Sequence, residues 1–207
     1  QHNTHILSLL KGQVTIPCVF AYGQLKNFQY MAMKILGLGI AEQWKKNRPG
    51  TGVMLTTLAG LEHIHLLWIV HCDTKPEKLL SALDDLTINI IDFDISKSFI
   101  YGFFKQVSIH KGMGQFTLTP LVVPSFYSYG VDLAPCNDLK SLAYIALFLL
   151  GGILPWTPHP HEESQLHSQD VIMKSSSSGK DLSLGFPVKF SDLLDYSCSL
   201  HFLSLEH

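Results

Sequence analysis

Two short apolar runs that each lead into an acidic residue set the strongest limit on how this chain can fold. Trp68-Ile69-Val70 leads into a polar loop containing Asp73, and a β-branched run from Leu86 to Phe93 contains Asp92 near its end. Runs of this kind are typical of short strands. A strand that ends in a polar loop presents a side chain rigidly, so we expect both carboxylates at a cleft, a common place for a ligand site.

Outside this stretch, the apolar pattern predicts a small strand-containing piece followed by a mostly helical piece. Helical spacing and terminal glycines predict helices that end near residue 10 and that cover 52–67, 138–150 and 190–202. Extended chain is expected at 14–22, a strand at 28–36, an aperiodic loop at 96–124 and a polar linker or disordered insert at 157–180. Gly37-Leu38-Gly39 lacks the third glycine of a phosphate loop, so we expect a flexible connector there.

Length and composition exclude several classes of protein. The 207 residues fit one domain with two lobes, and 46% of them are apolar, which is enough for a core. A net charge of −2 without long charged runs gives no support to a nucleic-acid or membrane partner. The longest apolar run, 142–156, is shorter than the ~20 residues of a spanning helix and predicts a buried helix.

The cysteines and the first residues indicate the cellular setting. Cys18, Cys72, Cys136 and Cys198 form no C-x-x-C pair, which argues against a zinc site or a disulfide framework and favours a reducing compartment. We therefore expect an intracellular protein, cytoplasmic or nuclear. The N-terminus, 1–5, has no signal-peptide pattern and no initiator methionine, which predicts a fragment.

Motifs along most of the chain resemble those of protein kinases. His71 to Lys78 (H-C-D-T-K-P-E-K) resembles the H-R-D-x-K-P-x-N catalytic loop, and Asp92-Phe93-Asp94 resembles the D-F-G motif. Four further segments resemble, in order, the I-P, M-E-L-L-G, D-D-L-E-S-L-G-Y and L-P-W motifs of the casein kinase 1 family: Ile16-Pro17, Met33 to Gly37, Asn137 to Tyr144 and Leu154 to Trp156.

The resemblance implies an α+β, protein-kinase-like fold with a truncated N-lobe. Residues 1–36 would be the N-lobe remnant, and 37–207 a mostly helical C-lobe with a polar insert at about 157–182. The Gly-rich loop and the strand that carries the nucleotide lysine would precede Gln1, so this chain lacks them.

The resemblance also implies a role for each matched residue in ATP- and Mg²⁺-dependent phosphorylation of a protein substrate. Asp73 would orient the substrate hydroxyl, Lys75 would neutralise the transferring phosphoryl group and Asp92 would bind Mg²⁺. Met33 would lie at the back of the adenine pocket, and the backbone groups of Lys34 and Leu36 would hydrogen-bond adenine. Leu80 and Ile91 would be the apolar residues that face the purine ring.

Several residues depart from the family pattern. Lys78 stands where an Asn would ligate a second Mg²⁺, and an ammonium repels a cation, although it could pair with phosphate directly. Asp94 replaces the D-F-G glycine, Cys72 replaces an Arg, and Asn3 stands at the position of the Glu that pairs with the nucleotide lysine. These changes predict a catalytically impaired, pseudokinase-like domain that acts through a binding partner. An active serine/threonine kinase with its N-lobe encoded upstream, and a decayed gene product without a stable function, remain alternatives.

The same residues also have purely structural interpretations. Asp73 and Asp92 could be relics that pair with Lys75 and Lys78. Asp138 matches a family residue that hydrogen-bonds the backbone of the catalytic loop, and His71 is expected to support that loop. His159, His161 and His167 lie in the polar insert without a regular ligand frame, so we expect a solvated loop there and no metal site.

Overall fold

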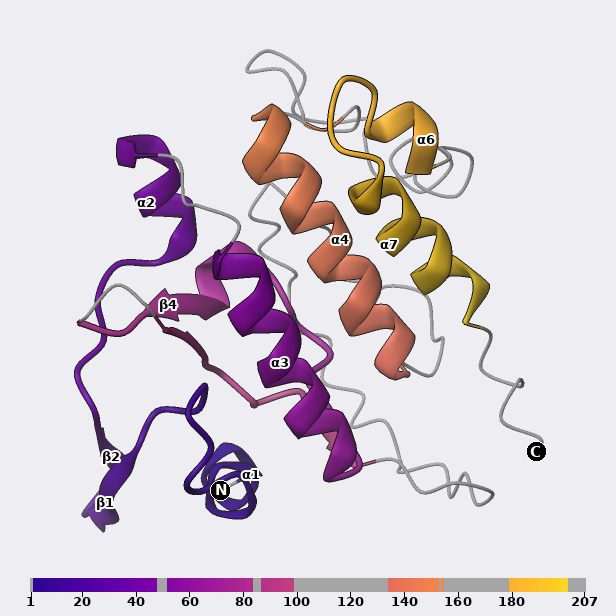
Figure 1. The fold of residues 1–207 in the computed structure, drawn as a ribbon. Helices are drawn as coiled ribbons and strands as arrows, with labels where there is room; N and C mark the ends of the chain where they lie inside the picture. Colours follow the sequence, from indigo (N-terminus) through magenta and orange to yellow (C-terminus); the bar gives the residue numbers. More distant parts are fainter. Residues whose placement is uncertain are drawn as a thin grey trace, which may run out of the picture.

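The architecture combines helices with small antiparallel sheets, which makes it α+β (Figure 1). The computed structural model describes residues 2–47, 52–83, 87–98, 134–152, 154 and 179–200. In chain order the elements are α1 (His2–Leu9), β1 (Val19–Leu25), β2 (Phe28–Met33), α2 (Ile40–Asn47), α3 (Gly52–Leu66), β3 (Ile69–Val70), a 3-10 turn (Pro76–Lys78), β4 (Leu79–Ser81), β5 (Ile88–Ile90), β6 (Lys97–Ser98), α4 (Pro135–Gly151), α6 (Gly179–Leu182) and α7 (Lys189–Ser199).

An antiparallel hairpin of β1 and β2 stands at the N-terminal side of the molecule, beside α1 (Figure 1). Its turn places Lys26 at a φ of 44°, and Gly23 pairs with Tyr30, whose ring lies where a Cβ of residue 23 would be. Phe20 and Phe28 remain 70% and 76% exposed. The hairpin therefore contributes little to the core.

Three helices form the body of the fold. α4 packs against α3 on one side and against α7 on the other (Figure 1). α4 begins at Pro135, where the Asn137 side chain accepts a hydrogen bond of 2.9 Å from the backbone N–H of Ala134. It ends at Gly152, whose φ of 83° closes the helix in the left-handed conformation that favours glycine. Every residue of 141–149 is buried, so α4 is the centre of the core.

Two further strand pairs connect this body to the loops that carry the acidic residues. β3 pairs with β6, and β4 pairs with β5 in the register Leu79 to Ile90 and Ser81 to Ile88. Ser81 also bonds to the segment that follows the hairpin: the Gly37 N–H donates to its carbonyl at 2.7 Å, and its own N–H donates to the Leu38 carbonyl at 3.0 Å. The expectation of a flexible connector at 37–39 is therefore wrong, because this segment is held against β4.

Most of the expected elements are present, with shifted ends. α3, α4 and α7 confirm the predicted helices at 52–67, 138–150 and 190–202, and Gly12 follows α1 with a φ of 93°. The strand predicted at 28–36 ends at Met33, while α2, β4 and β6 were not predicted. Residues 157–178 of the expected insert lie outside the described residues, as do residues 99–124 of the expected loop, and 179–182 form α6. Of the helices in the described ranges, none is long and apolar enough to cross a membrane.

Candidate functional site

The two predicted acidic loops meet where β3 and β5 end. Asp73 lies in the loop between β3 and the 3-10 turn, and Asp92 follows β5 by two residues. Cys72, directly before Asp73, and Asp92 itself both have a φ of 69°. This left-handed conformation costs of order 1–3 kcal/mol for a residue other than glycine and is concentrated at functional sites. Both carboxylates are therefore presented by strained backbone.

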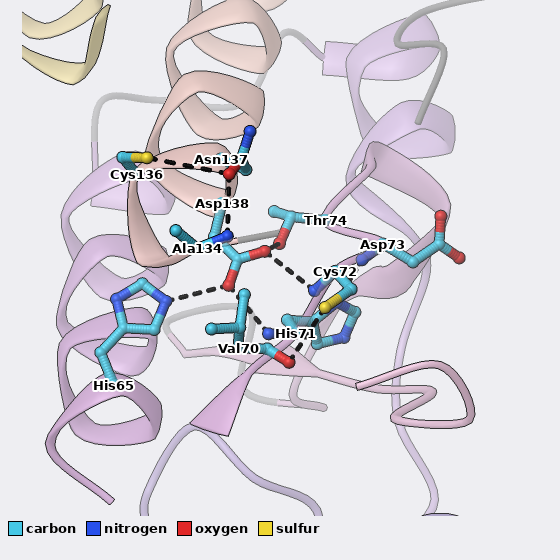
Figure 2. A network of polar contacts seen from close by, with 10 residues as sticks. All are labelled: His65, Val70, His71, Cys72, Asp73, Thr74, Ala134, Cys136, Asn137 and Asp138. Carbon is cyan, nitrogen blue, oxygen red and sulfur yellow. Dashed lines mark hydrogen bonds and ion pairs between the residues drawn. The ribbon is translucent and has the colours of Figure 1, made fainter. Parts of the chain in front are cut away.

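Asp138 on α4 holds the first of these loops in place (Figure 2). Its Oδ1 accepts hydrogen bonds from the Cys72 backbone N–H at 3.0 Å and from the Thr74 hydroxyl at 3.1 Å. Its Oδ2 accepts from the His71 backbone N–H at 2.8 Å and pairs with the His65 ring at 2.9 Å. The predicted contact between Asp138 and the backbone of this loop is thus confirmed, and it fixes the strained conformation of Cys72.

The network keeps the Asp138 carboxylate ionised although it is only 1% exposed. Burial alone would raise its pKa, but the hydrogen bond and charge of His65, together with His71, hold the pKa below the usual range for an aspartate. The strength of such charge-assisted bonds explains how a buried carboxylate can serve as a structural anchor.

His71 ties the two acidic loops together, as expected for a loop-supporting residue. Its Nδ1 accepts a hydrogen bond of 3.2 Å from the Asp73 backbone N–H, and its Nε2 lies 3.0 Å from the Ile91 carbonyl oxygen. Because a carbonyl can only accept, Nε2 is the ring nitrogen that donates to Ile91. The ring also packs edge-on against Phe93, with the ring centres 4.9 Å apart. The positions of Asp73 and Asp92 are therefore coupled through one buried side chain.

Each of the two carboxylates forms an ion pair with a nearby lysine. Lys75 Nζ lies 2.8 Å from Asp73 Oδ2, and Lys78 Nζ contacts Asp92 Oδ2. Burial alone would raise the pKa of Asp92, but the hydrogen bond and charge of Lys78, with the Asp94 backbone N–H, lower it below its ordinary value of 3.8. The predicted pairing of Asp73 with Lys75 and of Asp92 with Lys78 is therefore present, and the interpretation of the two carboxylates as relics stays a prediction.

The residues predicted to contact a nucleotide lie on two adjoining parts of the fold. Leu80 pairs with Asn89 across β4 and β5, so strand alternation places Ile91 on the same face as Leu80. Met33 ends β2, and Lys34 and Leu36 follow it in the segment that leads to α2 and is hydrogen-bonded to Ser81 of β4. The Lys34 N–H donates to the Cys18 carbonyl at 2.8 Å, so a ligand bond at Lys34 would have to use its carbonyl oxygen.

Three residues of this region were missed in the sequence. His65 and Thr74 complete the Asp138 network, but neither carries a motif signal of its own. Asn89 lies on the same face as Leu80, is 2% exposed, and its side-chain nitrogen has no hydrogen-bond partner within the described part of the chain. A polar residue among β-branched neighbours was the available signal for Asn89.

The residues at Asp92 do not fit a divalent cation in this arrangement. Mg²⁺ requires near-octahedral oxygen ligands, whereas the Asp92 carboxylate is engaged by the Lys78 ammonium. Among the residues that the structure describes, no three His, Cys, Asp or Glu side chains are grouped to hold a metal ion. A scan against models of known protein families finds no match for this chain.

Proposed function

We propose that this chain is a protein-kinase-like domain of the casein kinase 1 type that is catalytically impaired and acts by binding a partner protein. The observation that carries the proposal is the pairing of Asp73 with Lys75 and of Asp92 with Lys78. The two acidic loops are held in position, but their carboxylates are neutralised by lysines. This combination favours a domain that has the shape of a phosphoryl-transfer site and does not turn over substrate.

The support for a kinase-like site lies in how its loops are held. The two motifs that resemble H-R-D and D-F-G lie next to each other and are linked through His71. Asp138, far along the chain, accepts hydrogen bonds from the first of them. A centre for phosphoryl transfer works mainly by positioning and charge stabilisation, and rigid loops of this kind supply the positioning.

The support for impairment lies in the charges. In phosphoryl transfer, metal ions bridge the phosphates and neutralise the charge that develops on them. The Asp92 carboxylate forms an ion pair with Lys78, and Asp94, two residues further on, adds a second negative charge. Removing a single preorganised electrostatic contact in an enzyme typically lowers the rate by about 10²–10³-fold. Several such changes in one site make turnover at ordinary kinase rates improbable.

The test is transfer of radiolabelled phosphate from ATP with Mg²⁺ to a generic protein substrate, measured for the chain and for Asp73→Asn. The substitution keeps the size of the side chain and removes its charge, so it is a matched control. We expect equal, background-level transfer from both proteins. Transfer by the unchanged chain at ordinary kinase rates, lost in Asp73→Asn, would refute impairment.

The alternative is an active serine/threonine protein kinase that uses ATP and Mg²⁺. Retention of Asp73, Lys75 and Asp92 in adjoining loops favours it. Under this alternative the metal would supply charge neutralisation at the phosphates, and Lys78 would have to leave Asp92. The same assay separates the two proposals, because only the alternative predicts turnover that depends on Asp73.

A further inference from the structure

Lys78 and Asp92 are held together by backbone as well as by charge. The Ile91 N–H donates to the Lys78 carbonyl at 3.0 Å, which sets the two segments side by side. The Lys78 N–H in turn donates to the Lys75 carbonyl at 2.9 Å and closes the 3-10 turn. The backbone of Lys78 is therefore fixed next to the Asp92 carboxylate, whereas the position of a surface lysine relative to a nearby acid is not constrained in this way.

The pair is also partly shielded from water. The side chain of Lys78 is 20% exposed and that of Asp92 is 30% exposed. Ion pairs that are partly buried are screened less by salt than exposed ones. The Asp92 carboxylate additionally accepts a hydrogen bond from the Asp94 backbone N–H, which orients it.

A divalent cation would compete directly with this ammonium. Mg²⁺ binds a carboxylate oxygen at about 2.0–2.1 Å, so a cation on Asp92 Oδ2 would have to displace Lys78, and a cation on the other oxygen of the same carboxylate would still lie close to the ammonium. With Lys78 in place, the cation would face a like charge at close range, and like charges at such distances disfavour binding strongly. The described residues around the pair offer no group of three ligands to offset this repulsion.

We infer that Lys78 holds its ammonium group in a fixed position at Asp92, and that this site excludes divalent metal ions. The inference deepens the proposed function and rests on it for the identity of the site. Its consequence is that a phosphate-bearing ligand at this site meets the Lys78 ammonium directly, so its binding does not depend on Mg²⁺.

The experiment titrates Mn²⁺ alone and follows paramagnetic broadening of backbone amide signals by NMR. It compares the unchanged chain with Lys78→Asn, Lys78→Met and the double variant Lys78→Asn/Asp92→Asn. We expect no selective broadening of the amide signals near Asp92 in the unchanged chain. In both single variants these signals should broaden at Mn²⁺ concentrations about tenfold or more below any that broaden them in the unchanged chain. The double variant should lose this broadening. Any ADP-induced rise in Tm of the unchanged chain should be the same with Mg²⁺ and with EDTA.

Two results would overturn the inference. One is selective broadening at Asp92 in the unchanged chain as strong as in Lys78→Asn; the other is no broadening in either single variant. The dispersion of the amide spectra shows in the same samples whether each variant is folded, and Lys78→Asn and Lys78→Met each provide the comparison if the other is not folded. The proposed function fails on a different result, Asp73-dependent phosphate transfer, so the two failures are distinguishable.

Discussion

Asp138→Asn is the substitution that most directly tests how the candidate site is held together. The carboxylate accepts from two backbone N–H groups, of His71 and Cys72, from the Thr74 hydroxyl, and pairs with the His65 ring. Asparagine has nearly the same size but only one acceptor oxygen. Its amide nitrogen would face two of these donors, so about half of the network would be replaced by donor–donor contacts.

The magnitude follows from the bonds that are lost. A hydrogen bond to a charged group contributes about 1.5–3 kcal/mol, so losing two of them lowers the free energy of unfolding by roughly 3–6 kcal/mol. The whole stability of a domain is typically about 5–15 kcal/mol. For a chain of this length each kcal/mol shifts Tm by about 2–4 °C, which gives a fall in Tm of roughly 6–24 °C.

Thermal and urea denaturation followed by far-UV circular dichroism measures this effect. Asp192→Asn is the matched control, because Asp192 is an exposed aspartate whose carboxylate lies 3.8 Å from an exposed lysine amine. A surface substitution of that kind changes stability by no more than about 0.5 kcal/mol. If Asp138→Asn were no more destabilising than Asp192→Asn, the argument that Asp138 anchors the loop would be refuted.

The dependence on pH provides a second check of the same reasoning. Burial opposes ionisation of Asp138, but the His65 hydrogen bond and charge outweigh it, so the folded-state pKa lies below the ordinary value of 3.8. A lowered folded-state pKa stabilises the protein fully above the unfolded-state value, and this contribution is lost as the pH falls through the folded-state value. The stability difference between the unchanged chain and Asp138→Asn should therefore not shrink until the pH falls below about 4.

Two further predictions test the packing around the site. A Cβ on Gly60 would lie 2.8 Å from the Thr15 hydroxyl oxygen, whereas a Cβ on Gly52 meets nothing within 4 Å; Gly60→Val should therefore cost about 1–3 kcal/mol in urea denaturation, and Gly52→Val much less. Burial and then the Asp138 charge raise the pKa of the Cys72 thiol to about 12, while Cys18 is exposed. Brief iodoacetamide treatment at mildly alkaline pH, read by mass spectrometry, should alkylate Cys18 first, and equal rates would contradict the packing of Cys72.

The long helices could be predicted because each carries its own signal. The mostly apolar sequence of α4 and the glycine that follows it, Gly152, indicate a buried helix without any tertiary information. α2 was missed because its apolar face amounts to little more than Ile40 and Trp44. Trp44 is placed by the fold itself, since its indole N–H donates to the Leu149 carbonyl at 2.9 Å, over a hundred residues along the chain.

Short strands and the ends of elements depend on partners that a local pattern does not contain. β4 and β6 have three and two residues, too few to show an alternation, and exist through pairing with β5 and β3. β2 ends at Met33 although the apolar pattern continues to Leu36, because the following residues are drawn to Ser81 on β4.

The site shows the same division between local and distant information. The pair of Asp73 with Lys75 lies within one loop and could be considered from the sequence alone. The pair of Lys78 with Asp92 depends on the register of β4 and β5, which sets Lys78 beside Ile91 and so next to Asp92. The sequence could identify Lys78 as a departure from the family pattern and could suggest Asp92 as its partner, but the pairing of the strands is what brings the two side chains together.

These two pairs explain why positioning and activity need not be kept together. Positioning in this fold comes chiefly from groups other than Asp73 and Asp92, namely the Asp138 carboxylate and the His71 ring. Activity in a phosphoryl-transfer centre requires charges that are free to act on phosphate. The strained backbone at Cys72 and Asp92 is thus maintained by Asp138, by His71 and by the lysine pairs. Under the proposed function, a site held in this way loses metal binding through a single lysine and keeps the shape that a binding partner would recognise.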